Sequence, residues 1–107
     1  MTKVTILQNS EKECVGFDVF GHAGYAEEGE DIVCAAISVL VINTMNAIET
    51  YTDVHYTQDV SDGNISYRIK KPNNETTLLL NTMILGLQSL EENEIYTDYI
   101  DLIFEEV

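Results

Sequence analysis

Basic residues are scarce in this sequence: lysine and arginine together number five, against nineteen aspartates and glutamates. The net charge of −14 at neutral pH disfavours direct binding to nucleic acid, because the phosphate backbone is also negative. It favours a basic protein or peptide as partner, since opposite charges steer the encounter of two molecules. Acidity also serves solubility in many proteins, so the charge supports this hypothesis without establishing it.

Cysteine is rare as well, and the sequence lacks an export signal. Only Cys14 and Cys34 are present, and residues 1–11 contain no basic segment followed by an apolar one. Two cysteines in such a chain predict free thiols in a reducing cytoplasm and not a disulfide framework. No apolar run reaches the roughly 18 residues of a membrane span, because Asn43 and Asn46 interrupt the longest one, so no membrane partner is expected.

Three kinds of functional motif are missing. The sequence contains no glycine-rich phosphate loop, no Cys-x-x-Cys pair and no His-Glu cluster. Phosphate, redox and zinc chemistry therefore have no support, and no metal or cofactor is expected. What is present is an apolar content of 45 % in 107 residues, without a low-complexity run. This composition predicts one folded domain over residues 1–107, with a single core.

Hydrophobic periodicity predicts an α+β fold with the order β-β-α-β-β-α-β. A mainly antiparallel sheet with both helices on one face is the simplest packing of these elements. The first helix is expected from about Asp31 to Thr50, and apolar residues on more than one of its sides permit a partner besides the sheet. Asn74 is the predicted cap of the second helix. The expected strands cover residues 2–7, 14–20, 51–58, 64–70 and 97–104, with an Asp-Gly turn at 61–64.

A polar stretch between the second strand and the first helix has a reactive side chain near each end. His22 follows the strand, Cys34 opens the helix, and residues 23–30 between them are expected to form a mobile loop. Such a loop can bring the imidazole and the thiol together. If Asp31 is the N-cap, Cys34 lies in the first turn, where unpaired N–H groups favour a thiolate and can bind an oxyanion. His22 can then act as general base.

The acidic residues of this stretch oppose a thiolate. Glu27, Glu28, Glu30 and Asp31 are close to Cys34 in sequence, and their negative charge disfavours a second negative group. If their side chains face the solvent, screening reduces this repulsion, and the histidine and the helix end outweigh it.

Several other polar residues have a structural interpretation beside the functional one. Cys14 is expected to be a packing residue within its strand, and His55 an ordinary half-exposed histidine and not an alternative base. Ser38, one turn beyond the thiol, would either orient the reactive pair or bond back to its own helix. Asp31 would either orient His22 or, as its sequence position favours, cap the helix.

The stretch that carries these residues resembles the ribosomal-processing cysteine proteases of Firmicutes and related bacteria. Their pattern is close to G-H-A, a glycine-containing loop, then G-x-D-I-V-C-A-A-x-S, and no motif position departs from it. The length and the order of elements also fit, so the resemblance covers the whole chain. The matching residues are Gly21-His22-Ala23 and Gly29-Glu30-Asp31-Ile32-Val33-Cys34-Ala35-Ala36-Ile37-Ser38.

The resemblance implies a catalytic dyad, with Cys34 as nucleophile and His22 as general base. It implies that the substrate is the N-terminal extension of a basic large-subunit ribosomal protein, number twenty-seven, and that the enzyme is a homodimer. The family's cleavage follows an apolar, aromatic-rich segment, which implies an apolar groove near the dyad. The loop expected to order over the bound peptide contains Gly21, Gly24, Tyr25 and Gly29.

Two functions are therefore open on the sequence. The first is a cysteine endopeptidase, which the spacing of His22 and Cys34 favours. The second is a non-enzymatic acidic module that binds a basic ribosomal protein and keeps Cys34 for packing. Selective alkylation of Cys34 would favour the first, whereas equal, slow labelling of Cys14 and Cys34 would favour the second.

Overall fold

The computed structural model describes residues 1–21, 28–61 and 63–107. Within these ranges the chain forms five strands and two long helices in the predicted order, with a short 3-10 helix before the last strand. In chain order the elements are β1 (Thr2–Gln8), β2 (Cys14–Phe20), α1 (Glu28–Tyr51), β3 (Tyr56–Ser61), β4 (Asn64–Ile69), α2 (Asn74–Glu92), η1 (Thr97–Tyr99) and β5 (Ile100–Glu106).

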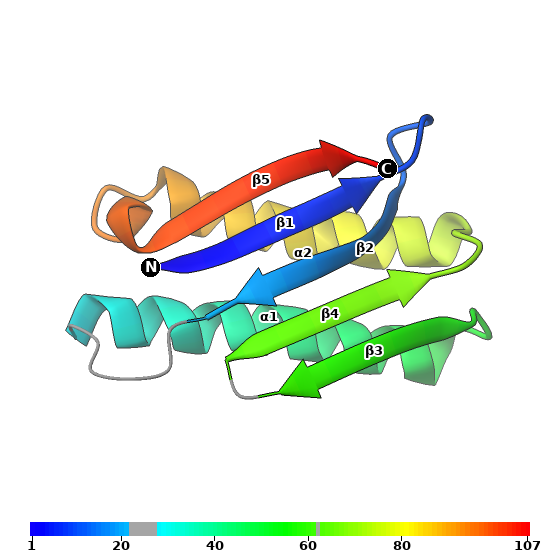
Figure 1. Cartoon of the computed structure of the whole chain (residues 1–107), viewed down its shortest axis with the longest axis horizontal. Helices are drawn as coiled ribbons and strands as arrows, with labels where there is room; N and C mark the ends of the chain where they lie inside the picture. The colour runs from blue at the N-terminus through cyan, green and yellow to red at the C-terminus, as the bar shows by residue number, and fades with distance from the viewer. Residues whose placement is uncertain (22–27, 62) are drawn as a thin grey trace.

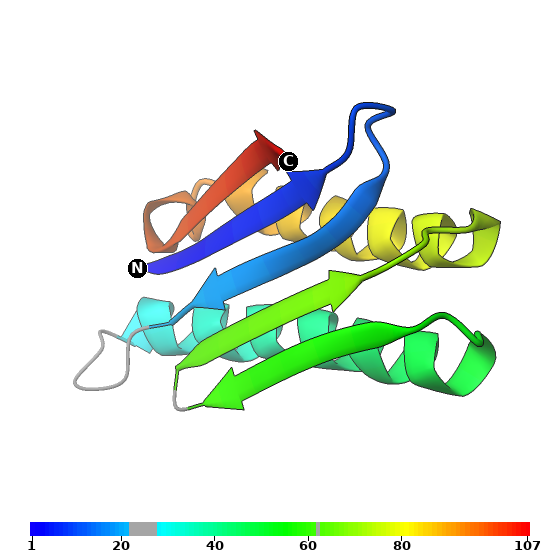
Figure 2. The ribbon, with the colours of Figure 1, turned by 45° about the vertical axis from the view of Figure 1, so that its right-hand side comes forward.

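The strands form one sheet in the order β3-β4-β2-β1-β5. Neighbouring strands run antiparallel except β1 and β5, which are parallel, so the prediction of a mainly antiparallel sheet is confirmed. Both helices cover the same face of the sheet, as the two ribbon views show (Figure 1, Figure 2). The helix α2 connects β4 to β5 and lets the last strand run parallel to β1 at the edge of the sheet.

The hydrophobic core lies between this face of the sheet and the helices. Its largest side chains are Phe17 of β2 and Tyr67 of β4, both 0 % exposed, whose ring centroids lie 5.2 Å apart. Tyr56 of β3 also stacks with Tyr67, at 5.4 Å. The helix α1 buries one side in the same core, because residues three, four or seven apart share one face of a helix. These residues of α1 are Val33, Ile37, Val41 and Ile48.

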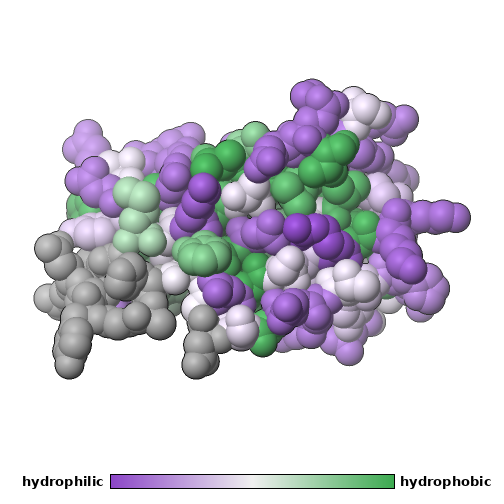
Figure 3. All heavy atoms as spheres, in the orientation of Figure 1, coloured by the Kyte–Doolittle hydropathy of each residue, from purple (hydrophilic) through white to green (hydrophobic). Residues whose placement is uncertain are grey.

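The opposite face of the sheet carries an ion pair. Asp18 of β2 accepts hydrogen bonds from both terminal nitrogens of the Arg68 guanidinium on β4, at 2.9 and 3.0 Å, and from the Ser66 hydroxyl at 2.8 Å. Polar side chains cover most of this face, with apolar ones between them (Figure 3). Ser66 and Arg68 alternate with the buried Tyr67 and Ile69, so this strand has one face in the core and one polar face.

The third strand begins later than predicted, at Tyr56, because α1 continues to Tyr51. The chain leaves the helix at Thr52, whose hydroxyl donates to the Ile48 carbonyl at 2.7 Å and accepts a bond from the Val54 N–H at 3.3 Å. Threonine satisfies backbone groups in this way where a helix ends. The expected strand over 51–58 was therefore wrong in its first half.

The cap of α2 is Asn73, and the prediction of Asn74 was wrong by one residue. Asn73 Oδ1 accepts from the Thr76 N–H, and Thr76 Oγ1 accepts from the Asn73 N–H, each at 2.9 Å. This reciprocal pair is a capping box. The last strand begins at Ile100, three residues later than predicted, because Thr97–Tyr99 form the 3-10 helix.

The helix α1 contains a segment that meets the length and composition of a membrane span, contrary to the expectation from the sequence. Within Asp31–Tyr51, a window of 18 residues has a mean hydropathy of 1.8. Core packing accounts for part of this apolar character, since Val33, Ile37 and Val41 are at most 1 % exposed beneath the sheet. Other apolar side chains of the helix lie outside the core, among them Val39 at 69 % exposure.

Candidate active site

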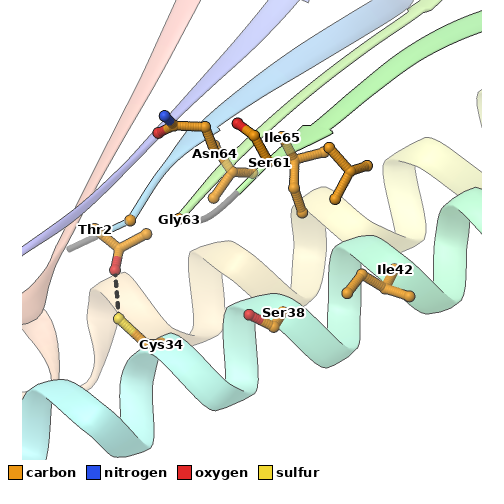
Figure 4. A pocket seen from close by; sticks show the side chains of 11 residues that line it. Thr2, Cys34, Ser38, Ile42, Ser61, Gly63, Asn64 and Ile65 are labelled. Atoms are coloured by element: carbon orange, nitrogen blue, oxygen red, sulfur yellow. Dashed lines mark hydrogen bonds between the residues drawn. The ribbon is translucent and has the colours of Figure 1, made fainter. Parts of the chain in front are cut away.

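A cavity of about 260 Å³ lies between α1 and the end of the sheet where β2 stops and the β3–β4 hairpin turns (Figure 4). Its wall is mainly apolar and combines segments from β1 to β4. Residues distant in sequence thus meet at one place. The lining residues are Thr2, Val19, Gly21, Cys34, Ser38, Ile42, Val60, Ser61, Gly63, Asn64 and Ile65.

The helix α1 contributes a row of three side chains, Cys34, Ser38 and Ile42. They stand four residues apart, so they lie on one face of the helix, which is directed toward the sheet (Figure 4). Cys34 is partly buried, whereas Ser38 and Ile42 are exposed. The thiol therefore stands at one end of the cavity, followed along the helix by a hydroxyl and then an apolar side chain.

The sheet contributes the facing wall. Val19 of β2 pairs in register with Ile65 of β4, and Ile65 pairs with Val60 of β3. Paired residues on adjacent strands point to the same side of a sheet. They form an apolar surface opposite α1, and Val60 at 57 % exposure marks where this surface opens to solvent.

Two glycines close the end of the cavity. Gly21, just after β2, donates its N–H to the carbonyl oxygen of Gly63 in the β3–β4 turn. Gly63 has φ of 76°, a left-handed conformation that suits glycine, and Ser61 and Asn64 pair on either side of the turn, so the predicted hairpin is confirmed. A Cβ atom on Gly21 would lie 3.0 Å from the Gly63 oxygen, so a larger residue would push the two segments apart.

Cys34 has a hydrogen-bond partner on β1. Thr2 Oγ1 lies 2.8 Å from Cys34 Sγ, and either atom can donate (Figure 4). Thr2 is 2 % exposed, because it begins the strand whose alternate residues Val4 and Ile6 enter the core. Both residues line the cavity, so the thiol meets a buried hydroxyl at this end of it.

The second cysteine is a packing residue, as predicted. Cys14 is 1 % exposed and its thiol donates to the Gly16 carbonyl at 3.4 Å. Burial raises the pKa of the Cys14 thiol, because the anion would lose its hydration. Cys34 is thus the more accessible of the two free thiols.

Asp31 is not the N-cap of α1, because the helix already begins at Glu28. Acidic residues in the first turn are favoured by the helix dipole, and this sequence has Glu28, Glu30 and Asp31 there. Cys34 is consequently the seventh residue of the helix, counted from Glu28, and lies beyond the unpaired N–H groups of the first turn. The exposed Asp31 remains a candidate supporting residue, but not as a cap.

Part of the predicted site lies outside the described residues, namely His22, Gly24 and Tyr25. Gly29 belongs to the first turn of α1, so residues 28–30 of the expected loop are helical. His55 is exposed and precedes β3, whereas Ser61 at the other end of that strand lines the cavity. The alternative base is therefore separated from Cys34 by the length of a strand.

Ser38 does not bond back to its own helix. Other serines and threonines do, as when Thr44 donates to the Leu40 carbonyl at 2.7 Å and Ser89 to the Leu85 carbonyl at 3.0 Å. In the part of the chain that the structure describes, Ser38 makes no such bond. Its hydroxyl is free to bond with a ligand in the cavity, which favours the supporting role.

The resemblance implied an apolar groove, but sequence reasoning identified neither its residues on β3 and β4 nor Thr2. The sequence contained a usable signal, because Thr2, Val4 and Ile6 are every second residue of a strand and therefore share its buried face. Nothing local indicates that this hydroxyl meets Cys34, because the contact spans 32 residues. A thiol at the end of an open apolar cavity is suited to attack a carbonyl whose neighbouring apolar side chain occupies that cavity.

The family described as cysteine protease Prp matches residues 1–101 of this chain. The ribosomal processing cysteine protease Prp of Staphylococcus aureus is 37 % identical over 97 residues, which are 86 % of this chain and 90 % of that protein. The protein of the same name from Bacillus subtilis is 26 % identical over 100 residues, which are 87 % of this chain and 89 % of that one.

Solved structures agree with this fold. The S. aureus protease Prp in complex with a substrate peptide superposes with a TM-score of 0.90 at 32 % identity, covering 98 % of this chain and 100 % of that one. The S. aureus protease with a covalently linked product peptide gives a TM-score of 0.85 at 33 % identity, with the same coverage.

Proposed function

Since the chain belongs to the Prp family of cysteine proteases, and is itself a cysteine protease, we propose that it cleaves a ribosomal protein, with Cys34 as its nucleophile. The observation that carries this proposal is the position of Cys34, partly exposed at the end of an apolar cavity, while Cys14 is buried. Family membership decides between the two functions that were open on the sequence, in favour of the enzyme.

His22 is the proposed general base. It follows Gly21, which lines the cavity, so the chain passes the site directly before this histidine. His22 takes the proton of the Cys34 thiol, and the thiolate attacks the peptide carbonyl carbon to give a tetrahedral intermediate. The C–N bond then breaks, His22 returns the proton to the leaving amine, and a thioester remains on Cys34. Water hydrolyses the thioester and frees the thiol.

The proposed substrate is the N-terminal extension of the large-subunit ribosomal protein number twenty-seven. Relatives are named for ribosomal processing, and one of them binds a substrate peptide. The apolar wall of Val19, Val60 and Ile65 suits an apolar or aromatic side chain beside the cleaved bond. The charge of −14 suits a basic ribosomal protein.

We propose in addition that the enzyme works in the cytoplasm as a homodimer. Ribosomal proteins are made there, and both cysteines of this chain are free thiols. Exposed apolar side chains on α1, Ile32 at 49 % and Val39 at 69 %, would be buried in a dimer. Sedimentation at micromolar concentration tests this, and a monomer there contradicts it.

The experiment is single-turnover cleavage of a peptide that copies the N-terminus of that ribosomal protein. Cys34→Ala should abolish cleavage while the melting temperature stays within a few degrees, because the nucleophile is lost and the helix is kept. Cys34→Ser should be nearly inactive, since a hydroxyl is a far poorer nucleophile. His22→Ala should lose about 100-fold or more, the usual contribution of a general base.

Two variants serve as matched controls. Cys14→Ser and His55→Ala remove the other thiol and the other imidazole, and both should leave cleavage nearly unchanged. Cleavage by Cys34→Ala at the parent rate, with contaminating protease excluded, would contradict the assignment of the nucleophile.

A further inference from the structure

We propose that Thr2 is a positioning residue for Cys34, and that its hydroxyl stabilises the thiolate. This inference rests on the proposed role of Cys34 as nucleophile. It assigns a function to the first residue of β1, which belongs to no motif of the sequence.

The contact itself is the first observation. Thr2 Oγ1 lies 2.8 Å from Cys34 Sγ (Figure 4). The two residues are 32 positions apart, so the chain does not impose the contact locally, and the packing of α1 under the sheet creates it. Thr2 is 2 % exposed, so bulk water does not compete freely for its hydroxyl.

The sheet fixes the position of the hydroxyl. The strand β1 lies between β2 and β5, and Thr2 pairs with Ile100 of β5. A threonine within a strand has few allowed rotamers because its Cβ atom is branched. The hydroxyl therefore approaches the sulfur from a rigid element and costs little reorganisation during reaction.

The chemistry of the pair depends on the protonation state. While Cys34 is a thiol, either atom can donate. Once His22 has removed the proton, the sulfur can only accept, and Thr2 must donate to it. A hydrogen bond to the charged form favours that form. This bond provides support that the helix end does not, because Cys34 lies beyond the first turn of α1.

Few other charges act on the sulfur within the described residues. Those described residues that line the cavity carry no charged side chain. On α1 the exposed Asp31 lies one turn earlier, on β1 the amino terminus at Met1 adjoins Thr2, and on η1, which contacts α1, Asp98 is exposed. His22 is the proposed base. Asp31, the amino terminus, Asp98 and His22 are the same in every variant compared below. Differences between the variants therefore report on the Thr2 hydroxyl.

The test compares Thr2→Val with Thr2→Ser in a Cys14→Ser background. Valine keeps the shape and loses the hydroxyl, whereas serine keeps the hydroxyl and loses a methyl group. The first measurement is the rate of iodoacetamide alkylation of Cys34 from about pH 5 to about pH 10, which follows the thiolate. The second is kcat/KM for peptide cleavage over the same range, and thermal melting checks the fold of each variant.

Thr2→Val should move the midpoint of alkylation upward by about one pH unit and lower alkylation and kcat/KM at neutral pH by about tenfold, since one unit corresponds to a tenfold change in the thiolate fraction. Above the shifted midpoint the alkylation rate should return to the parent value. Thr2→Ser should stay within about twofold of the parent throughout, because its hydroxyl still donates.

An unchanged midpoint in Thr2→Val would overturn the proposal, as would equal losses in Thr2→Val and Thr2→Ser at every pH, which would indicate packing alone. Alkylation reads Cys34 without any cleavage. A failure of this proposal is therefore distinguishable from a failure of the proposed function, which shows instead as continued cleavage by Cys34→Ala.

Discussion

Tyr67 buries a hydroxyl that has no hydrogen-bond partner among the described residues. Its ring stacks with Phe17 and Tyr56, and the side chain is 0 % exposed. Its Oη is buried and makes no hydrogen bond in the part of the chain that the structure describes. Burial, with the nearby Tyr56, raises the pKa of Tyr67 to about 12, so the phenol remains neutral at working pH. The ring is thus used for packing alone.

Tyr67→Phe should therefore raise the free energy of unfolding by up to about 1 kcal/mol, because it removes a polar group that is desolvated without compensation. Denaturant unfolding monitored by circular dichroism measures this. Tyr67→Ala is the control and should lose about 3 to 5 kcal/mol through the cavity that it leaves. A loss of more than 1 kcal/mol in Tyr67→Phe would show that the hydroxyl has a bond that it does not make here.

Residues that belong to a motif were predictable, and residues recruited by packing were not. Cys34 was found from the sequence because a histidine and a helix start flank it, and the structure places it at the cavity. Thr2 lies in no motif, and its contact with Cys34 depends on how α1 crosses β1. The cap of α1 was misplaced because Asp31 suits both a cap and the interior of a first turn.

Elements were predictable where polar and apolar residues alternate cleanly. The strand β2 has the expected bounds, Cys14–Phe20, and both helices were found. The predicted start of β3 was wrong because residues 51–55 show no clear alternation of polar and apolar residues. The end of α1 is instead marked by the hydrogen bond from the Thr52 hydroxyl to the Ile48 carbonyl. The order of strands and the parallel pairing of β1 with β5 are long-range properties that local periodicity does not determine.

The ion pair between β2 and β4 gives the sheet a pH dependence of known sign. The Arg68 guanidinium, which donates to Asp18, and the Ser66 hydroxyl hold the pKa of the Asp18 carboxyl below its ordinary value. Because the pKa of Asp18 is lower in the folded state than in the unfolded state, the pair stabilises the fold at any pH above the unfolded-state pKa. This contribution is lost as the pH falls through the folded-state pKa.

Asp18→Asn should lower the free energy of unfolding at pH 7 by about 0.5 kcal/mol, a small amount because the two side chains are 42 % and 43 % exposed. The difference from the parent should shrink as the pH is lowered below about 4, where the carboxyl becomes neutral in both folded and unfolded states. Thermal melting across pH measures it. Asp59→Asn, an exposed acid paired in register with Ser66, is the control and should show a smaller difference at pH 7. A difference for Asp18→Asn that grows in acid would contradict the assigned sign.

At the scale of the whole molecule, the charge of −14 should govern the encounter with a basic substrate. Raising NaCl from about 0.05 M to about 0.5 M should lower kcat/KM for the basic peptide by about tenfold, because screening weakens attraction between exposed charges. The loss should lie mainly in kcat/KM and not in kcat at saturation. A peptide with its lysines replaced by glutamine is the control, and an equal salt dependence for both peptides would contradict charge steering.

The interior position of β1, between β2 and β5, has a consequence for synthesis on the ribosome. The strand emerges before the other four, and β2 can cover one of its edges early, but the other edge pairs with β5, the last strand of the sheet in chain order. During translation that edge is left open until β5 has left the exit tunnel. Pairings between chain ends are slow to close, because a long loop must first be ordered. The strand that carries Thr2 therefore gains its second neighbour late, and the partner of Cys34 is held on both sides only when β5 is available.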